Sequence, residues 1–241
     1  MSIEKISIII PVFNEEKTII SILNKVSIVN LTNNLKKEII IINDGSIDNT
    51  HSLITQYLVK NESDNIIYKT LNQNNGKGFA IQDAIKLATG DYVLIQDADL
   101  EYAPKDYNVL INPVITNEAD IVFGSRYCNY SFVEKISKLH ALINSFISYC
   151  FYLSSGMKTS DVETCYKLLP LKFLKEITLK ERGFGIEIEI SHYIANSNLR
   201  FTEVPIQYSR RDYKAGKKIK FTDGLKAMYL IIRNGFSIKT K

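Results

Sequence analysis

The chain has 241 residues, 45% of them hydrophobic, which is enough apolar material for one globular core with an appended subregion rather than two independent domains. Its three cysteines, Cys128, Cys150 and Cys165, are odd in number and far apart, which argues against a disulfide framework and a zinc site and suits a reducing cytosol. The formal net charge is +4, and eleven Lys and Arg against three Asp and Glu fall between Arg200 and Lys241, so the basic charge is concentrated at one end.

The first predicted strand begins within a few residues of Met1, without the basic region and apolar leader of a secretory signal, so we expect the protein to stay in the cytoplasm. Apolar strand-like runs then alternate with helical stretches: strands are predicted over residues 6–12, 38–43, 66–69, 92–96 and 120–123, and helices over 15–31, 47–60, 76–89 and 104–117. This alternation predicts an α/β fold in which helices cover both faces of a parallel sheet. Ligands of such sheets bind beyond the carboxyl ends of the strands, where Asp44, Asp97 and Asp99 fall.

Two glycines flank a lysine where the third strand gives way to a helix. Gly76 and Gly78 permit close approach of another group to the backbone, and Lys77 adds a positive charge between them. This pattern indicates a phosphate or nucleotide contact near a helix N-terminus, and the alternative is a Gly-rich turn with a solvated lysine. The spacing matches neither a Walker loop nor a dinucleotide-binding fingerprint.

The fourth strand ends in two carboxylates, Asp97 and Asp99, one residue apart. Clustered negative charges are costly unless a cation joins them, and hard oxygen ligands suit Mg²⁺ or Mn²⁺ bridged to the phosphates of a substrate. Acidic residues after strands are also common as helix caps and in solvated loops, so the pair alone is a weak motif. It gains weight because the first and second strands also end in acidic or amide residues, at positions 14–16 and 43–44.

Two segments in the second half carry apolar faces at helical spacing. Residues 133–156 contain a wide stripe that includes Phe146, Ile147 and Phe151, but its dense part is too short to cross a bilayer, which needs about 20 residues. A second apolar face near the C-terminus lies beside basic side chains and consists of Leu225, Met228, Tyr229, Ile231 and Ile232. Such faces either complete a core, pack on a partner or lie on a membrane surface.

Taken together, short motifs along nearly the whole chain resemble those of the family 2 glycosyltransferases, the inverting GT-A type, and more closely their polyprenyl-phosphate sugar synthase branch. The motifs are residues 11–15 (PVFNE), 43–46 (NDGS), 76–78 (GKG), 96–101 (QDADLE), 124–126 (GSR), 160–167 (SDVETCYK), 184–189 (FGIEIE), 203–206 (EVPI), Arg211 and 216–219 (GKKI). The resemblance implies a GT-A, Rossmann-like sheet in a single domain over residues 1–241. Its nucleotide-sugar and metal half would be residues 1–125 and its acceptor half residues 126–241.

The resemblance also implies roles for individual residues. The nucleotide-sugar pocket would contain Pro11, Phe13, Asn14, Glu15, Asp44, Lys77, Asp97, Ala98 and Asp99, joined by Arg211 and Lys217 from a later loop. Mg²⁺ or Mn²⁺ would be held by Asp97, Asp99 and Glu101, and the catalytic residues would be Asp97, Asp99, Arg126, Asp161 and Arg211. Many members of this branch carry Gln where Glu101 stands, and many extend into transmembrane helices that this sequence does not show, so we expect peripheral membrane contact.

The predicted reaction is inverting transfer of a hexose from a UDP- or GDP-linked sugar to a polyprenyl phosphate. An acceptor phosphate is already anionic, whereas a sugar hydroxyl of a polysaccharide or glycolipid would need a carboxylate as base, for which Asp161 and Glu163 are the candidates. Asp161 could instead cap a helix or pair with Arg126.

The sequence also bears on other classes of protein and on other binding partners. A dehalogenase-type phosphatase and a non-catalytic nucleotide-sugar-binding protein are the alternatives from other classes. Nucleic-acid binding is not expected, because no basic-aromatic module accompanies the basic end. We expect a cytoplasmic protein; peripheral contact with the inner face of the cell membrane and a homo-oligomer both stay open.

Overall fold

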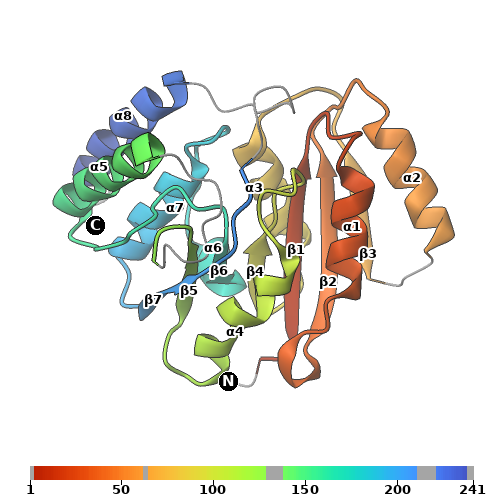
Figure 1. Ribbon diagram of the computed structural model, residues 1–241, viewed down its shortest axis with the longest axis horizontal. Helices are drawn as coiled ribbons and strands as arrows, with labels where there is room; N and C mark the ends of the chain where they lie inside the picture. Colours follow the sequence, from red (N-terminus) through yellow and green to blue (C-terminus); the bar gives the residue numbers. More distant parts are fainter. Residues whose placement is uncertain (1–2, 62–64, 129–137, 211–220, 238–241) are drawn as a thin grey trace.

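The computed structural model describes residues 3–61, 65–128, 138–210 and 221–237, and a mixed sheet runs through the middle of the molecule (Figure 1). The strands lie in the order β3-β2-β1-β4-β6-β5-β7 across the sheet. Their bounds are β1 (Lys5–Val12), β2 (Lys36–Asn43), β3 (Ile66–Thr70), β4 (Tyr92–Ile95), β5 (Ile121–Ser125), β6 (Lys167–Pro170) and β7 (Phe201–Pro205). The apolar runs of β1, β2 and β4 are almost wholly buried, as expected of strands covered on both faces.

The predicted α/β fold is confirmed, with one strand that runs against its neighbours. The strands β1 to β4 pair in parallel, and β5 pairs in parallel with β7, but β6 is antiparallel to both β4 and β5. β6 is only four residues long and its first side chain, Lys167, is fully buried, so neither length nor polar alternation distinguishes it in the sequence. It separates β4 from β5, which follow each other in the predicted series.

Helices cover both faces of the sheet. Their bounds are α1 (Ile19–Ile28), α2 (Thr50–Lys60), α3 (Lys77–Leu87), α4 (Tyr107–Ile115), α5 (Lys138–Ser155), α6 (Leu171–Glu176), α7 (Ile186–Ala195) and α8 (Phe221–Ser237), with 3-10 turns η1 (Thr32–Asn34) and η2 (Pro104–Asp106). The four helices predicted between strands are present, each shorter than its sequence pattern indicates. In Figure 1, α1 and α4 lie in front of the sheet and α3 behind it, and the arrowheads of β1, β2 and β4 point to the same upper edge.

A helical layer of α5, α7 and α8 has a small core of its own at the end of the sheet away from β3 (Figure 1). Its buried members are Ile147, Phe151, Val162, Ile188, Ala227, Leu230 and Ile231. Each fully buried aliphatic or aromatic side chain of this size stabilises a fold by roughly 1.5–3 kcal/mol. Because Val162 belongs to the loop between α5 and β6, this cluster also fixes that loop.

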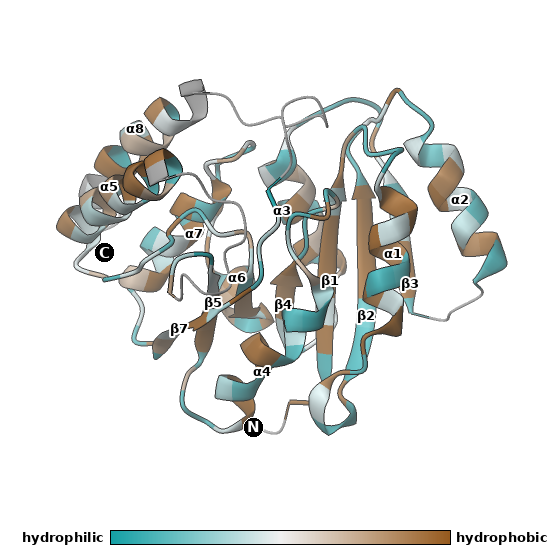
Figure 2. Ribbon diagram, viewed as in Figure 1, coloured by the Kyte–Doolittle hydropathy of each residue, from teal (hydrophilic) through white to brown (hydrophobic). Residues whose placement is uncertain are grey.

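Of the alternatives left open for the apolar stripe within residues 133–156, completion of a core is confirmed for Ile147 and Phe151, which pack into this second core and are at most 3% exposed. These two side chains therefore cannot face a membrane. Phe146 points outward and is 58% exposed, while residues 133–137 lie outside the described part of the chain. The exposed apolar side chains of the two helices, here called the α5–α8 face, are Leu139, Leu142, Ile143, Phe146, Tyr149, Tyr152, Leu153, Leu225, Tyr229 and Ile232. Hydrophobic segments of both helices are visible in Figure 2. Within the described ranges no helix is long and apolar enough to span a bilayer.

Candidate active site

A cavity of about 420 Å³ opens at the carboxyl ends of β1, β2 and β4. β1 lies between β2 and β4, so the cavity is at the point where the strand order reverses, the usual ligand site of open parallel sheets. Most of the predicted site residues line it: Pro11, Phe13, Glu15, Asp44, Lys77, Asp97, Ala98, Asp99, Glu101 and Arg126. Asn14 and Asp161 are not part of the cavity wall, and Arg211 and Lys217 lie outside the described residues.

The loops after β1 and β2 are tied to each other and to the start of α3. Asn14, with a φ of 50°, accepts a hydrogen bond from the N–H of Ile47 at 2.9 Å. Asp44 is 2% exposed, and its carboxylate accepts the backbone N–H groups of Asn75 and Gly76 at 2.8 and 2.7 Å. Burial raises the pKa of this carboxyl, and the two N–H donors offset part of the effect. These contacts fix one end of the cavity. Contact of Asn14 and Asp44 with a nucleotide stays a prediction.

The carboxylates after β4 project from a tight turn. Gln96 is fully buried; its Nε2 donates to the carbonyl of Asp97 at 2.9 Å, and its Oε1 accepts the hydroxyls of Tyr107 and Tyr166 at 2.8 and 2.6 Å. Leu100 has a φ of 66°, a left-handed conformation that a branched side chain adopts only at a cost. The surrounding contacts impose this strain, which turns the chain sharply after the second carboxylate and leaves both acids on the cavity wall.

Glu101 connects this acidic turn to the segment before residue 211. Its N–H donates to Asp99 Oδ1 at 3.0 Å, and its Oε2 accepts the hydroxyl of Tyr208 at 2.6 Å. Its carbonyl accepts the N–H of Ser209 at 2.9 Å. Among the residues that the structure describes, no three Asp, Glu, His or Cys side chains come close enough to hold a metal ion by themselves. The predicted metal-binding set of Asp97, Asp99 and Glu101 therefore stays a prediction.

Lys77 connects the acidic turn to α7. Its Nζ lies 2.7 Å from Asp97 Oδ1 and 2.7 Å from Glu187 Oε1, and its side chain is only 12% exposed. Burial by itself would lower the pKa of Lys77, but the charges of Asp97 and Glu187 outweigh it and raise the pKa well above its ordinary value. The alternative of a solvated lysine is therefore excluded.

The glycines on either side of Lys77 let another loop pack directly on the start of α3. A Cβ atom on Gly76 would collide with the carbonyl oxygen of Arg182, and one on Gly78 would collide with that of Glu181. In addition, the N–H of Phe79 donates to the Arg182 carbonyl at 3.0 Å. The group that approaches these glycines is thus the backbone of residues 181–183, and this contact brings the start of α7 onto the lysine.

Arg126, which lines the cavity, forms a two-pronged ion pair with Asp161. Arg126 Nε lies 2.7 Å from Oδ2 and Nη2 lies 2.6 Å from Oδ1, and Asp161 is fully buried. The rings of Tyr127 and Tyr208 flank the guanidinium, 5.5 and 5.3 Å from its Cζ. The predicted alternative of an Arg126–Asp161 salt bridge is confirmed. The pair uses only some of the five guanidinium N–H donors, so the others can bind an anion in the cavity.

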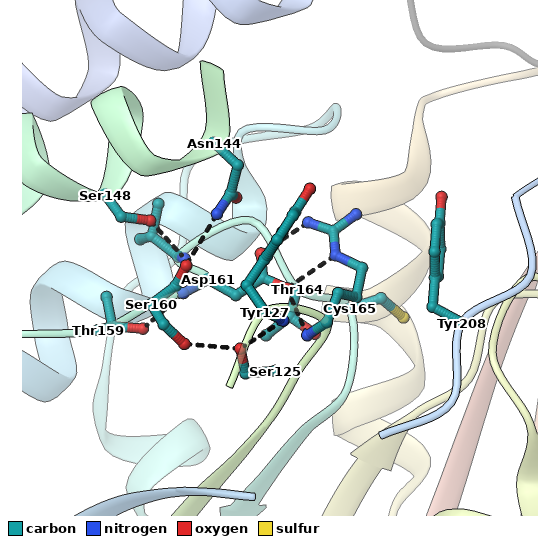
Figure 3. Close-up of polar contacts among 12 residues, drawn as sticks. Ser125, Tyr127, Asn144, Ser148, Thr159, Ser160, Asp161, Thr164, Cys165 and Tyr208 are labelled. Carbon is teal, nitrogen blue, oxygen red and sulfur yellow. Dashed lines mark hydrogen bonds and ion pairs between the residues drawn. The ribbon is translucent and has the colours of Figure 1, made fainter. Parts of the chain in front are cut away.

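The loop that carries Asp161 is held by a dense set of polar contacts, drawn in Figure 3. Ser160 is hydrogen-bonded to Ser125 through the two hydroxyls at 2.6 Å, and its carbonyl accepts Asn144 Nδ2 at 2.8 Å. Beneath the loop, the fully buried Nζ of Lys167 donates to the carbonyls of Val162 and Thr164. Burial lowers the pKa of Lys167 to about 8, and the nearby carboxylates limit this effect. This loop is therefore rigidly placed.

Glu163 is the carboxylate of this loop that lines the cavity. Burial raises its pKa to about 7 from the ordinary 4.5; Arg126 opposes this shift, and the charges of Asp161 and Glu187 add to it. A carboxyl whose pKa lies near neutrality can act as a general base or acid.

Comparison with known proteins decides the family. The family model described as "Glycosyl transferase family 2" matches residues 7–177. The chain belongs to glycosyl transferase family 2. A dolichyl-phosphate beta-glucosyltransferase of Dictyostelium discoideum is 30% identical over 224 residues, which cover 86% of this chain and 67% of that protein. A UDP-N-acetylglucosamine–dolichyl-phosphate N-acetylglucosaminyltransferase of Methanococcus voltae is 26% identical over 96% of each chain.

Solved structures identify the fold of this family 2 glycosyltransferase as GT-A. Glucosyl-3-phosphoglycerate synthase from Mycobacterium tuberculosis, in complex with Mn²⁺, UDP and glucosyl-3-phosphoglycerate, matches with a TM-score of 0.68 at 19% identity, over 97% of this chain and 79% of that one. The same enzyme with Mg²⁺ and UDP matches with a TM-score of 0.70 at 18% identity, over 97% and 80% of the two chains. The predicted GT-A, Rossmann-like sheet is confirmed.

Several residues of the cavity received no role from the sequence. Glu187, Phe184 and Lys226 line the cavity, and Gln96 supports the acidic turn from below. The first two belong to a motif that the sequence does contain, residues 184–189, but nothing in its pattern shows that it meets residues 76–78 more than 100 positions earlier. The local sequence signal for Glu187 is its place, with Glu189, as one of two acidic residues among isoleucines.

Proposed function

We propose that this family 2 glycosyltransferase moves a hexose from a nucleoside diphosphate sugar to a polyprenyl phosphate, with inversion at the anomeric carbon. The observation that carries the proposal is the double role of α8, whose Lys226 and Ala227 line the cavity while its Leu225, Tyr229 and Ile232 are exposed. An acceptor anchored in lipid needs such an arrangement, because its head group must reach the cavity while its tail stays in an apolar phase. The printed names of two relatives, both of which include dolichyl phosphate, support the same class of acceptor.

The acidic turn fits a divalent cation shared with the donor. Mg²⁺ is usually held by one or two carboxylates and by substrate phosphates, rather than by a closed set of protein ligands. Asp97 and Asp99 line one wall of the cavity, and Asp97 already forms an ion pair with the ammonium group of Lys77. When bound, Mg²⁺ or Mn²⁺ would supply positive charge at the diphosphate. Glu101 would add a third contact, and Pro11, Phe13, Glu15 and Asp44 would surround the nucleoside.

Arg126 is the residue proposed to bind the acceptor phosphate. In the reaction, a phosphate oxygen attacks the anomeric carbon from the face opposite the diphosphate, and the bond from that carbon to the diphosphate oxygen breaks, leaving its electron pair on the diphosphate. The attacking phosphate is already anionic and needs no base. Asp161 orients Arg126 through two hydrogen bonds and offsets its charge. Arg211 and Lys217 would stabilise the leaving diphosphate, and both lie outside the described residues.

The α5–α8 face is proposed to rest on the cytoplasmic leaflet of the cell membrane. It presents seven exposed apolar side chains from α5 and three from α8, and α8 also lines the cavity through Lys226 and Ala227. Eleven Lys and Arg in the last 42 residues add attraction to anionic lipid. The three cysteines are free thiols, which suits a reducing compartment.

The donor can be identified by release of nucleoside diphosphate. The protein would be incubated with UDP-glucose, UDP-N-acetylglucosamine or GDP-mannose, together with polyprenyl phosphate and Mn²⁺ or Mg²⁺. We expect one donor to give product that depends on both the acceptor and the metal, and EDTA to abolish it. Equal turnover in EDTA would contradict the metal assignment.

A second candidate function is transfer to a sugar hydroxyl, and the position of Glu163 favours it. This carboxylate lines the cavity beside Arg126, and its pKa of about 7 suits removal of a hydroxyl proton. Soluble glycan acceptors would then replace polyprenyl phosphate in the same assay, and E163Q would abolish that activity.

A further inference from the structure

Lys226 is the most exposed of the described cations that line the cavity. These cations are Lys77, Arg126 and Lys226, and their side chains are 12%, 14% and 49% exposed. Lys77 lies between two carboxylates and Arg126 is paired with Asp161, each through contacts of 2.6 to 2.7 Å. The ammonium of Lys226 is therefore the described positive charge of the cavity that is most open to an arriving anion.

The ion pair that the structure describes for Lys226 is loose. Its Nζ lies 3.4 Å from Oε2 of Glu181, beyond the usual length of a charged hydrogen bond. Oε1 of the same carboxylate accepts Nη2 of Arg233 at 2.7 Å, so the charge of Glu181 is already offset. A half-exposed pair of this kind contributes little free energy, and the lysine stem is flexible. Lys226 can therefore turn to another anion while Arg233 keeps Glu181 in place.

The position of Lys226 puts its charge between the cavity and the apolar surface. A Cβ atom built on Gly183, which also lines the cavity, would lie 3.5 Å from Lys226 Nζ, so the ammonium itself lies beside the cavity wall. Leu225 and Tyr229 of the same helix are each 60% exposed and belong to the α5–α8 face. Successive helical positions differ by about 100° in direction, so Lys226 lies at the border of that face.

A ligand that fits this border carries an anionic group on an apolar chain. A phosphate monoester of a long isoprenoid has both parts, and lysines beside an apolar surface attract lipid phosphates. A nucleotide sugar has no apolar chain, and its diphosphate would lie at the acidic turn, near Asp97 and Asp99. The lipid acceptor is therefore the better match for Lys226.

We propose that Lys226 binds the phosphate of the lipid acceptor as it enters the cavity from the α5–α8 face, and so determines the affinity for the acceptor. This role rests on the proposed function, because it requires a polyprenyl phosphate as substrate. Lys226 supplies a movable point charge, whereas Arg126 presents a fixed guanidinium plane, so the two cations suit entry and final binding. Glu181 is the positioning residue, since it holds the ammonium at the cavity wall.

The test separates the affinity for the acceptor from the affinity for the donor. Wild type, K226M, K226R and the control K158M would be assayed with polyprenyl phosphate in a neutral detergent, with Mn²⁺ and the preferred nucleotide sugar. Lys158 is an exposed lysine that follows α5 and does not line the cavity. In K226M the KM for polyprenyl phosphate should rise about tenfold, because a charged contact with the phosphate is lost. K226R retains the charge and K158M retains the contact, so both should stay within about twofold of wild type.

Affinity for UDP and GDP, measured by calorimetry in Mn²⁺, is the second readout. It should be the same in K226M as in wild type, which also shows that the variant is folded. An equal loss of affinity for the nucleoside diphosphate would place Lys226 at the donor and overturn the proposal. A loss of transfer that K226M shows on anionic liposomes and not in neutral detergent would indicate general attraction to the membrane, and would overturn it too.

A short prenyl phosphate and the corresponding prenol, used as competitors of polyprenyl phosphate, isolate the contact with the phosphate. Wild type should bind the phosphate more tightly than the alcohol. The ratio of the two affinities should fall about tenfold in K226M and stay unchanged in K158M, because only the variant at the cavity loses a partner of the phosphate. An equal ratio in K226M and wild type would contradict the contact.

The results also distinguish the role of Lys226 from the proposed function. If wild type glycosylates polyprenyl phosphate and K226M does so with an unchanged KM, the role of Lys226 is wrong and the proposed function stands. If wild type glycosylates soluble hydroxyl acceptors and no polyprenyl phosphate, the proposed function fails and the role of Lys226 fails with it.

Discussion

The ammonium of Lys77 is the only described cation within 2.7 Å of both Asp97 and Glu187, and it is buried with them. Replacing it by Met would leave two carboxylates in a poorly solvated site without their counter-charge. We expect K77M to lower the midpoint of thermal unfolding by about 5–10 °C, because breaking a buried pair typically costs about 3–5 kcal/mol. The control is K86M on the same helix, whose side chain is 71% exposed and should change the midpoint by about 1 °C at most. Equal midpoints for the two variants would refute the buried bridge.

Asp99 is predicted to matter for turnover and not for folding. It lies on the cavity wall, and its Oδ1 accepts the N–H of Glu101, a bond that the amide of Asn can also accept. D99N should therefore lower sugar transfer at least about 100-fold, because it removes a charge from the proposed metal ligand, with the thermal midpoint within about 2 °C of wild type. D120N, at a carboxylate that pairs with Arg200, serves as the control and should retain activity. Wild-type rates in D99N would remove this residue from the metal site.

Glu163 makes stability depend on pH. Its pKa is about 7 in the folded protein against an ordinary 4.5, so the folded state holds the proton more tightly than the unfolded chain. Folding stability should thus fall as pH rises from about 4.5 to about 7, by up to about 3 kcal/mol from this group. Urea unfolding of E163Q should show a smaller fall between pH 5 and pH 8 than wild type, whereas E118Q, at an exposed position, should match wild type. Parallel curves for E163Q and wild type would show that the carboxyl is not perturbed.

The helices α5 and α8 expose far more apolar surface than a solvated helix pair requires. If they rest on a membrane, the double variant L142E/F146E should reduce co-sedimentation with anionic liposomes by about tenfold or more. The matched control is I28E/V59E, which places the same charges on exposed apolar residues of α1 and α2. Binding of wild type should also weaken at high salt, because attraction between basic side chains and anionic lipid is screened. Unchanged binding of L142E/F146E would rule out this face.

Elements defined by their own side chains could be predicted from the sequence, and elements defined by distant contacts could not. β1 and β2 are runs of isoleucine that can only be buried strands, and the amphipathic helix between them, α1, follows directly. The segment from Ile186 to Ile190 alternates Ile and Glu, which is typical of a strand, yet it forms the start of α7. It can do so because Glu187 pairs with Lys77 and Glu189 caps two backbone N–H groups, so both acids are accommodated in a buried helix.

At the scale of the whole molecule, the carboxyl ends of three neighbouring strands place Asp44, Asp97 and the residues around Phe13 in one cavity, as the order of motifs indicated. Parallel strands meet at one edge, so this half of the candidate site could be predicted from strand order alone. The other wall is built by residues 183–187 and by Glu163 in the loop of Asp161. These residues reach the cavity through the contact of residues 181–183 with Gly76 and Gly78 and through packing of α5, α7 and α8. No local pattern specifies such packing.

The most direct test of the proposed function compares two acceptors that differ only in the phosphate. Purified protein would be incubated with its preferred nucleotide sugar, Mn²⁺ and either polyprenyl phosphate or the corresponding polyprenol, and products would be measured by mass spectrometry. If Arg126 presents a phosphate to the anomeric carbon, only polyprenyl phosphate should gain a hexose, and R126A should abolish the product. Transfer to polyprenol at a comparable rate, or transfer to soluble glycans with none to polyprenyl phosphate, would contradict the account.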